Sequence, residues 1–232
     1  MGNVYHFDEE RYTTESPIKA YQQRYHLALW VTGHRVEGNW AHPDEESSFF
    51  ELKAHVENVL RRVGLQAGQV VTEASDNNIF DKGLRMKTRG GKVLVDMGIV
   101  NHHVLRRFDI EQPVYYAEID WTELMKATRK NSLLFQELSK YPAVSRDLAL
   151  LVDANVEFAQ IEQIARQTEK KLLKQVVLFD VYQGKNLPEG KKSYAVNFIL
   201  QDESRTLTDK AIEAIMQKLM KNLTTKLHAE LR

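Results

Sequence analysis

The sequence predicts an α+β protein with two domains, each built from an antiparallel sheet with helices packed against it. The chain has 232 residues, which is somewhat long for one domain, and 43% of them are hydrophobic, enough for ordinary globular cores. Segments with strand-like alternation recur between segments with helical spacing, as in α+β folds. Pro142 disfavours helical geometry at Tyr141 and marks a boundary. We therefore predict domains at residues 1–138 and 139–232.

The composition excludes several kinds of site. The sequence contains no cysteine, which excludes disulfides, zinc–thiolate centres and thiol nucleophiles. No apolar run reaches the length of a membrane span and the first residues do not resemble a signal peptide, so we expect a cytoplasmic protein without membrane contact. The 32 basic and 32 acidic residues cancel, which argues against a protein that coats nucleic acid through bulk charge.

In the first domain, strand formers and turn residues predict an antiparallel sheet with one main helix. From Phe49 to Val63 apolar residues recur at helical spacing, with a serine before them to cap the start and Gly64 after them. Arg89-Gly90-Gly91 predicts a hairpin turn, and residues 121–125 a short helix. Strands are expected at residues 4–7, 25–31, 69–73, 84–88, 92–100 and 113–119.

The first domain offers little candidate chemistry. His102-His103 is a weak metal signal, because adjacent strand residues face opposite sides and no carboxylate lies at ligand spacing. We expect a turn or a surface pair there, and a small hydrolase that uses these histidines is the least favoured function. Gly90-Gly91-Lys92 lacks the glycine spacing and the following helix of a phosphate loop. We predict no catalytic residue and no metal ligand.

The second domain has the element order strand, helix, strand, strand, helix, strand. Strands are expected at residues 145–152, 177–182, 193–200 and 229–232. One helical stripe ends near Glu169 and the other begins after Thr208, a good N-cap. The first stripe contains Phe158, Ile161, Ile164, Ala165 and Leu172. This order is the ferredoxin-like, split βαβ pattern, in which two helices cover one face of the sheet and leave the other open.

Strand alternation predicts which residues line that open face. Asp180 and Tyr182 are expected there, while Val177, Phe179 and Val181 point the other way. The partner strand has an apolar row of Tyr194, Val196, Phe198 and Leu200. Its opposite row, on the open face, is Ser193, Ala195 and Asn197. If Ala229 and Leu231 enter the core, Glu230 and Arg232 also emerge on the open face.

A ring, a carboxylate and a hydroxyl on one open sheet suit an unpaired nucleic-acid base. The loop between the two central strands adds phosphate-seeking charge at Lys185, Lys191 and Lys192. Each of these residues also has a structural alternative. Tyr182 could be an edge aromatic, Asp180 could bond the Gly184 turn, and the lysines could form a solvated loop. A protein-interaction module that pairs sheet to sheet, without RNA binding, is the alternative function.

Four motifs of the second domain resemble a known family. They are YPAVSRDLALLVD, LFDVYQGKNLPEGKKSYAVNF, RTLTD and AELR. Together they resemble the ferredoxin-fold anticodon-binding domain of the bacterial phenylalanyl-tRNA synthetase beta subunit. GNVY, SSFFELKAHVENVLRRVGL and YYAEIDWTEL in the first domain are similar to the catalytic-like domain of that subunit, a class II synthetase core without its chemistry. The resemblance covers nearly the whole chain.

The resemblance implies a C-terminal fragment of a longer beta subunit, which fits a first strand at residues 4–7 that begins without a cap or turn. It implies a part in tRNA(Phe) anticodon recognition and subunit scaffolding, within a phenylalanine–tRNA ligase of two alpha and two beta subunits. ATP and magnesium belong to the full enzyme, with ATP and phenylalanine bound by the alpha subunit. We expect no cofactor and no aminoacylation in this fragment alone, and exposed apolar surface on its first domain.

The resemblance also implies roles for individual residues. Tyr182 would stack on the first anticodon base, a guanine, while Asp180 accepts from its amino and imino groups. Ser193 and Arg232 would add polar or phosphate contacts, and Ala143 a close backbone or apolar contact. The candidate phosphate contacts are Arg146, Lys185, Lys191 and Lys192.

Overall fold

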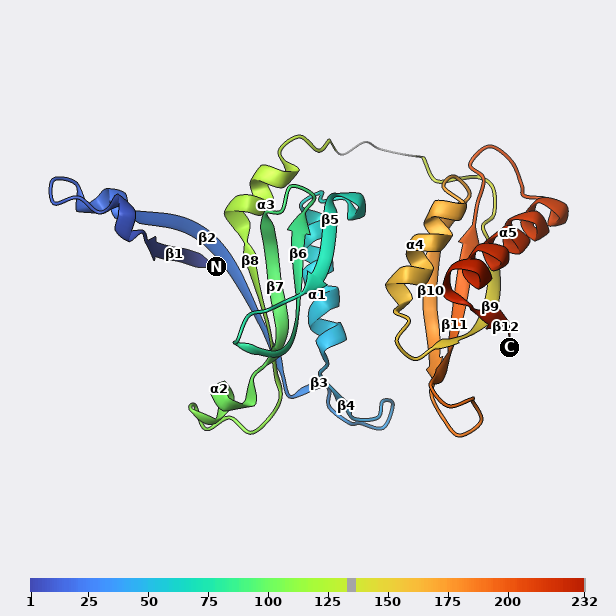
Figure 1. Cartoon of the computed structure of the whole chain (residues 1–232), viewed down its shortest axis with the longest axis horizontal. Helices are drawn as coiled ribbons and strands as arrows, with labels where there is room; N and C mark the ends of the chain where they lie inside the picture. Colours follow the sequence, from blue (N-terminus) through green and yellow to red (C-terminus); the bar gives the residue numbers. More distant parts are fainter. Residues whose placement is uncertain (133–136, 232) are drawn as a thin grey trace. The chain divides into compact units, whose positions relative to one another are not determined.

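The chain divides into two compact units in a computed structural model, Met1–Leu134 and Phe135–Arg232 (Figure 1). The structure describes residues 1–132 and 137–231, apart from the side chain of Ala67. Each unit combines an antiparallel sheet with helices, which confirms the predicted α+β class. Within the described residues, every helix is too short or too polar to cross a bilayer.

The first unit is a six-stranded antiparallel sheet in the order β1-β2-β8-β7-β6-β5. The strands are β1 (Gly2–Phe7), β2 (Tyr21–Thr32), β5 (Val70–Ala74), β6 (Phe80–Thr88), β7 (Val93–Val100) and β8 (Val114–Asp120). Two short strands, β3 (His34–Val36) and β4 (Glu45–Glu46), form a separate ribbon. The helices are α1 (Phe49–Arg62), α2 (His102–Arg106) and α3 (Trp121–Thr128).

Helix α1 forms where the predicted stripe and caps lie. The Ser48 side chain accepts from the Glu51 N–H, and Gly64 follows the helix in the left-handed region at φ +83°. The buried stripe packs with α3 against one face of the sheet, so the opposite face stays uncovered by these helices. The hairpin between β6 and β7 is also confirmed, because Gly91 has φ +82° and donates its N–H to Thr88.

His102 and His103 lie in α2 and both are exposed, which confirms the surface pair and not the turn. Asn101 caps this helix by accepting from the His103 N–H. The His102 ring lies 3.4 Å from Asp81, and within the described residues no three histidine or acidic side chains gather as metal ligands do. Both rings are exposed, whereas the hydrolase alternative requires a convergent pocket around them.

The second unit has the ferredoxin-like βαββαβ order, as predicted. Its strands are β9 (Val144–Asp153), β10 (Leu173–Tyr182), β11 (Lys191–Leu200) and β12 (Glu230–Leu231), in the sheet order β10-β11-β9-β12. Its helices are α4 (Phe158–Thr168) and α5 (Asp209–Leu227). Leu172 lies after α4, not on it, but still packs against the core.

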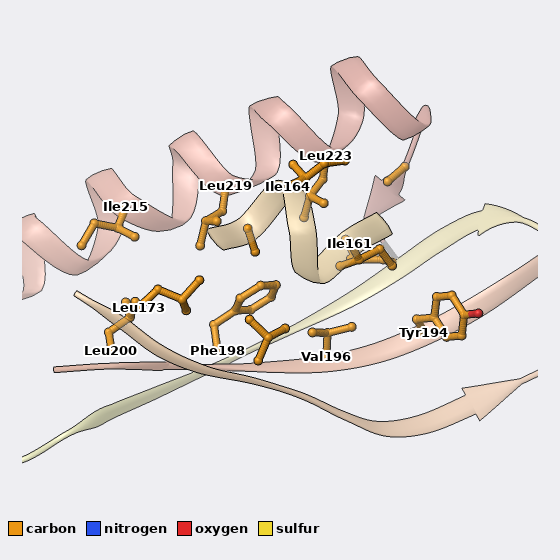
Figure 2. Close-up of a cluster of buried hydrophobic side chains, with 14 of the residues drawn as sticks. Ile161, Ile164, Leu173, Tyr194, Val196, Phe198, Leu200, Ile215, Leu219 and Leu223 are labelled. Atoms are coloured by element: carbon orange, nitrogen blue, oxygen red, sulfur yellow. The ribbon is translucent and has the colours of Figure 1, made fainter. Parts of the chain in front are cut away.

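Both helices of the second unit cover the same face of its sheet. Figure 2 shows Ile161 and Ile164 of α4, and Leu219 and Leu223 of α5, directed toward the apolar row of β11. Phe198 is at the centre of this core and is 0% exposed. The core residues of β11 alternate with Ser193, Ala195 and Asn197, so these three lie on the face without helices.

Candidate functional site

The open face of the second unit brings together three of the predicted site residues. Asp180 pairs with Ala195 across β10 and β11, and Tyr182 pairs with Ser193. Directly opposite residues of antiparallel strands point to the same side of a sheet. The carboxylate, the phenol and the hydroxyl therefore share one patch on the side away from α4 and α5.

A β-bulge at Phe179 corrects the predicted alternation in β10. Leu178 pairs with Val196 and Asp180 with Ala195, so Phe179 is an extra residue between two consecutive pairs. Val177, opposite Asn197, is therefore on the open face, whereas Val181, opposite Tyr194, is on the helix face. Asp180 and Tyr182 keep the predicted face because the bulge precedes both of them.

The patch has a recessed hydroxyl and two more exposed groups. Tyr182 is 37% exposed and Asp180 is also exposed. Ser193 is only 7% exposed, since it lies in a central strand between Tyr182 on β10 and Leu151 on β9. A flat ligand that contacts the ring would reach the hydroxyl only at the bottom of the patch.

The same face carries a polar cluster that the sequence reasoning did not identify. The Asn197 amide donates to the Ser145 hydroxyl and to the Asp147 carboxylate, both on β9. Alternation along β9 could have revealed these residues, because they share parity with Ala149 and Leu151 of the open face. The cluster ties β9 to β11 and holds one carboxylate at a fixed position on this surface.

The three lysines do not form one basic loop, which corrects their predicted setting. Lys185 is exposed in the β10–β11 connection, but Lys191 and Lys192 are the first residues of β11. Lys191 lies on the open face with its Nζ 3.0 Å from Asp153 and 3.9 Å from Glu230. Lys192 is 8% exposed on the helix face, where its Nζ lies 4.8 Å from the centre of the Tyr194 ring.

The remaining predicted residues lie elsewhere. Arg146 is opposite Phe198, hence on the helix face, and its guanidinium is 4.0 Å from Asp209 at the start of α5. Ala143 precedes β9 and is eight residues from Leu151, roughly 26 Å along an extended strand, so it lies at the other end of the sheet from Ser193. Arg232 lies outside the described residues.

Strand β12 is an edge strand beside β9, and it pairs with the part of β9 that lies opposite Ser193. Glu230 pairs with Leu151 on the open face, as expected, and Ala229 is buried. Leu231, expected in the core, is 53% exposed although it pairs with Leu150 on the helix face. The edge position of this short strand leaves Leu231 partly uncovered.

The uncovered face of the first sheet carries both basic and acidic side chains, and two of its arginines are paired with carboxylates. Arg24 lies 3.0 Å from Asp120, and Arg85 lies 2.6 Å from Asp76 and 2.9 Å from Asp96. The hydrogen bond to Asp96 raises the pKa of the Arg85 guanidinium. On the same face His26 lies beside Glu118, and Lys87 pairs with Glu73.

Large apolar side chains are also exposed on the first unit, and Trp30 lies on this same uncovered face, opposite Tyr116. Trp30 stacks on Tyr116 with ring centres 4.1 Å apart, yet it is 62% exposed. The other strongly exposed side chains include Tyr5, Phe7, Ile18, Trp40 and Phe50. Exposed apolar groups in this number are typical of a surface that contacts another macromolecule.

Comparison with known proteins gives matches to both units. Residues 1–121 match the family described as the phenylalanyl tRNA synthetase beta chain CLM domain. Residues 139–232 match the ferredoxin-fold anticodon binding domain. Similar curated proteins are the phenylalanine–tRNA ligase beta subunits of Bacteroides thetaiotaomicron (55% identity over 232 residues) and Porphyromonas gingivalis (49% over 231 residues). Each alignment covers all of this chain but only 28% of the relative.

Proposed function

This chain belongs to the phenylalanyl-tRNA synthetase beta-chain family, and on that premise we propose that its second unit binds the anticodon loop of tRNA(Phe). The observation that carries the proposal is the joint placement of Asp180, Tyr182 and Ser193 on an open sheet face. The first unit acts as a noncatalytic scaffold toward the alpha subunit of phenylalanine–tRNA ligase. Its exposed apolar side chains support that part of the proposal.

The patch chemistry matches a guanine at the first anticodon position. The Tyr182 ring offers a stacking surface, worth about 1–3 kcal/mol per base by alanine substitution. Asp180 accepts hydrogen bonds from the imino and amino groups that guanine presents on one edge. Ser193 lies deeper and would contact a base that has already stacked. Lys185 in the connecting loop is the candidate for a phosphate contact.

The proposal assigns ATP, magnesium and the chemical step to the alpha subunit. On the uncovered face of the first sheet, Arg24 and Arg85 are engaged by carboxylates, which supports this assignment. Under this proposal the chain alone binds RNA but does not form phenylalanyl-tRNA.

The decisive experiment measures binding of the 232-residue chain to a synthetic anticodon stem-loop RNA by fluorescence anisotropy. Tyr182→Ala should weaken binding about 5- to 140-fold, the equivalent of the stacking energy. Val181→Ala is the matched control, since Val181 is adjacent but lies on the helix face, and it should leave the affinity nearly unchanged. Asp180→Asn should reduce the preference for guanine over adenine at the first anticodon position. Equal affinity for both bases in the unaltered chain would refute the proposal.

A second candidate function follows from the apolar part of the same face. Ala149, Leu151, Val177 and Ala195 are half-buried open-face residues, as in a sheet that pairs with another protein surface. If this function holds, sedimentation without RNA will show a dimer that Tyr182→Arg dissociates. A monomer that binds the stem-loop excludes it.

A further inference from the structure

We propose that Gly184 is a positioning residue for the Tyr182 ring. Gly184 lies two residues after Tyr182, in the connection between β10 and β11. Its lack of a side chain leaves the space in which the phenol end of Tyr182 lies against the backbone of this connection. The inference rests on the proposed function for its consequence in RNA binding, but the ring position can be tested without RNA.

The geometry at Gly184 leaves no room for a Cβ atom while the ring is in place. A Cβ built there would lie 2.6 Å from the Tyr182 Oη, 2.8 Å from Cζ and 3.3 Å from Cε2. Carbon atoms in contact are normally about 3.5–4.0 Å apart. Any residue other than glycine would therefore displace the outer half of the phenol ring.

Backbone conformation does not explain this glycine. Gly190, in the same connection, has φ +76° and serves the turn, as Gly33, Gly64 and Gly91 do elsewhere. Gly184 is outside that left-handed region, so its backbone conformation is open to other residues. Its carbonyl accepts from the Leu187 N–H at 3.1 Å, an interaction that a side chain at residue 184 would not remove. The ring is the neighbour that a side chain would meet.

The position of the ring matters because stacking depends on a flat surface held at a defined place. With Gly184 beneath its hydroxyl end, the ring lies beside the Asp180 and Ser193 patch before RNA arrives. A displaced ring must return to this place when RNA binds. Holding the side chain about 30° from its preferred rotamer should weaken RNA binding about 2- to 12-fold.

The first test reads the ring position directly, by NMR on the full chain without RNA. The Tyr182 ring current should shift the Gly184 α-proton resonances in the unaltered chain, and Tyr182→Leu should return them to ordinary values. This measurement needs no variant at Gly184, so it remains decisive even if Gly184→Ala fails to fold. Unshifted Gly184 resonances in the unaltered chain would overturn the proposal.

The second test is a double-mutant cycle with the stem-loop RNA. Gly184→Ala should weaken binding about 2- to 12-fold in the unaltered chain, and also in Tyr182→Phe, because the Cζ clash at 2.8 Å remains. In Tyr182→Ala the same change should alter binding by less than about twofold. Gly90→Ala is the control, since its Cβ would have only an ordinary contact, 3.8 Å from Thr88 Oγ1.

The outcomes separate the two proposals. A loss that persists in Tyr182→Ala would show that Gly184 acts on the loop and not through the ring, which overturns the inference. If the unaltered chain does not bind the stem-loop, the proposed function fails, while the Gly184 resonances still decide whether the glycine positions the ring.

Discussion

Deletion of Phe179 provides a sharp test of the bulge that assigns β10 residues to their faces. Because Phe179 is an extra residue between two consecutive pairs, its removal should leave Leu178 opposite Val196 and Asp180 opposite Ala195. The strand becomes regular, and Tyr182 remains opposite Ser193 on the open face. If β10 were a regular strand without a bulge, removing one residue would turn every following side chain to the other face. Tyr182 would then leave the open face.

The energetic cost of this deletion should be small. The Phe179 side chain is 58% exposed, so the change gives up less than half of the area of a buried ring, roughly 80 Å². At about 25 cal/mol per Å² this is about 2 kcal/mol. The shortened chain also has one residue fewer to order on folding, which offsets about 1–2 kcal/mol of this cost. We expect the second unit to lose about 0–1 kcal/mol of stability.

Amide hydrogen exchange in β11 measures this stability, and tryptophan fluorescence supplies an internal control. All three tryptophans, Trp30, Trp40 and Trp121, lie in the first unit, so their signal should not change. Deletion of Val181 is the matched comparison, because it moves Tyr182 opposite Tyr194 on the helix face, to a position where Val181 is 47% exposed. That variant should lose more stability than the Phe179 deletion, because it turns Tyr182 and the residues after it to the other face of the sheet. Lost β11 protection on Phe179 deletion, with protection kept on Val181 deletion, would refute the reasoning.

Three further predictions concern the two cores and one titration. Phe198→Ala should destabilise the second unit by about 3–5 kcal/mol in urea, whereas Phe50→Ala, at a side chain that is 77% exposed, should change stability by less than about 0.5 kcal/mol. Gly98→Ala should destabilise the first unit by about 1–3 kcal/mol in thermal unfolding, since its Cβ would lie 2.6 Å from the Phe80 ring; an unchanged transition would contradict the packing. Burial, together with Glu118, raises the pKa of Tyr116 to about 12, above its unfolded value near 10. The neutral phenol therefore contributes stability that is complete below pH 10 and is lost between pH 10 and 12. The absorbance difference at 295 nm between the unaltered chain and Tyr116→Phe should titrate near pH 12, and a midpoint near 10 would count against it.

Elements with local signals can be predicted from the residues of the chain alone. Ser48 and Thr208 cap helices because a side-chain oxygen reaches the nearby N–H, and Gly91 closes a hairpin because of its own φ. The helical stripes and the βαββαβ order follow from periodicities that neighbouring residues carry. The family motifs added Asp180 and Tyr182 as candidate site residues, and these two lie together on the open face with Ser193.

The place where strand alternation breaks, and the side chains that pack together, depend on contacts within the folded chain. The bulge at Phe179 depends on how β10 pairs with β11. It places Val177 and Val181 on opposite faces, although residues four apart in a regular strand lie on the same face. The phenol of Tyr182 lies against Gly184 through packing that strand alternation does not reveal. Strand register and side-chain packing are set by contacts between segments far apart in the chain, and no local pattern of residues encodes those distances.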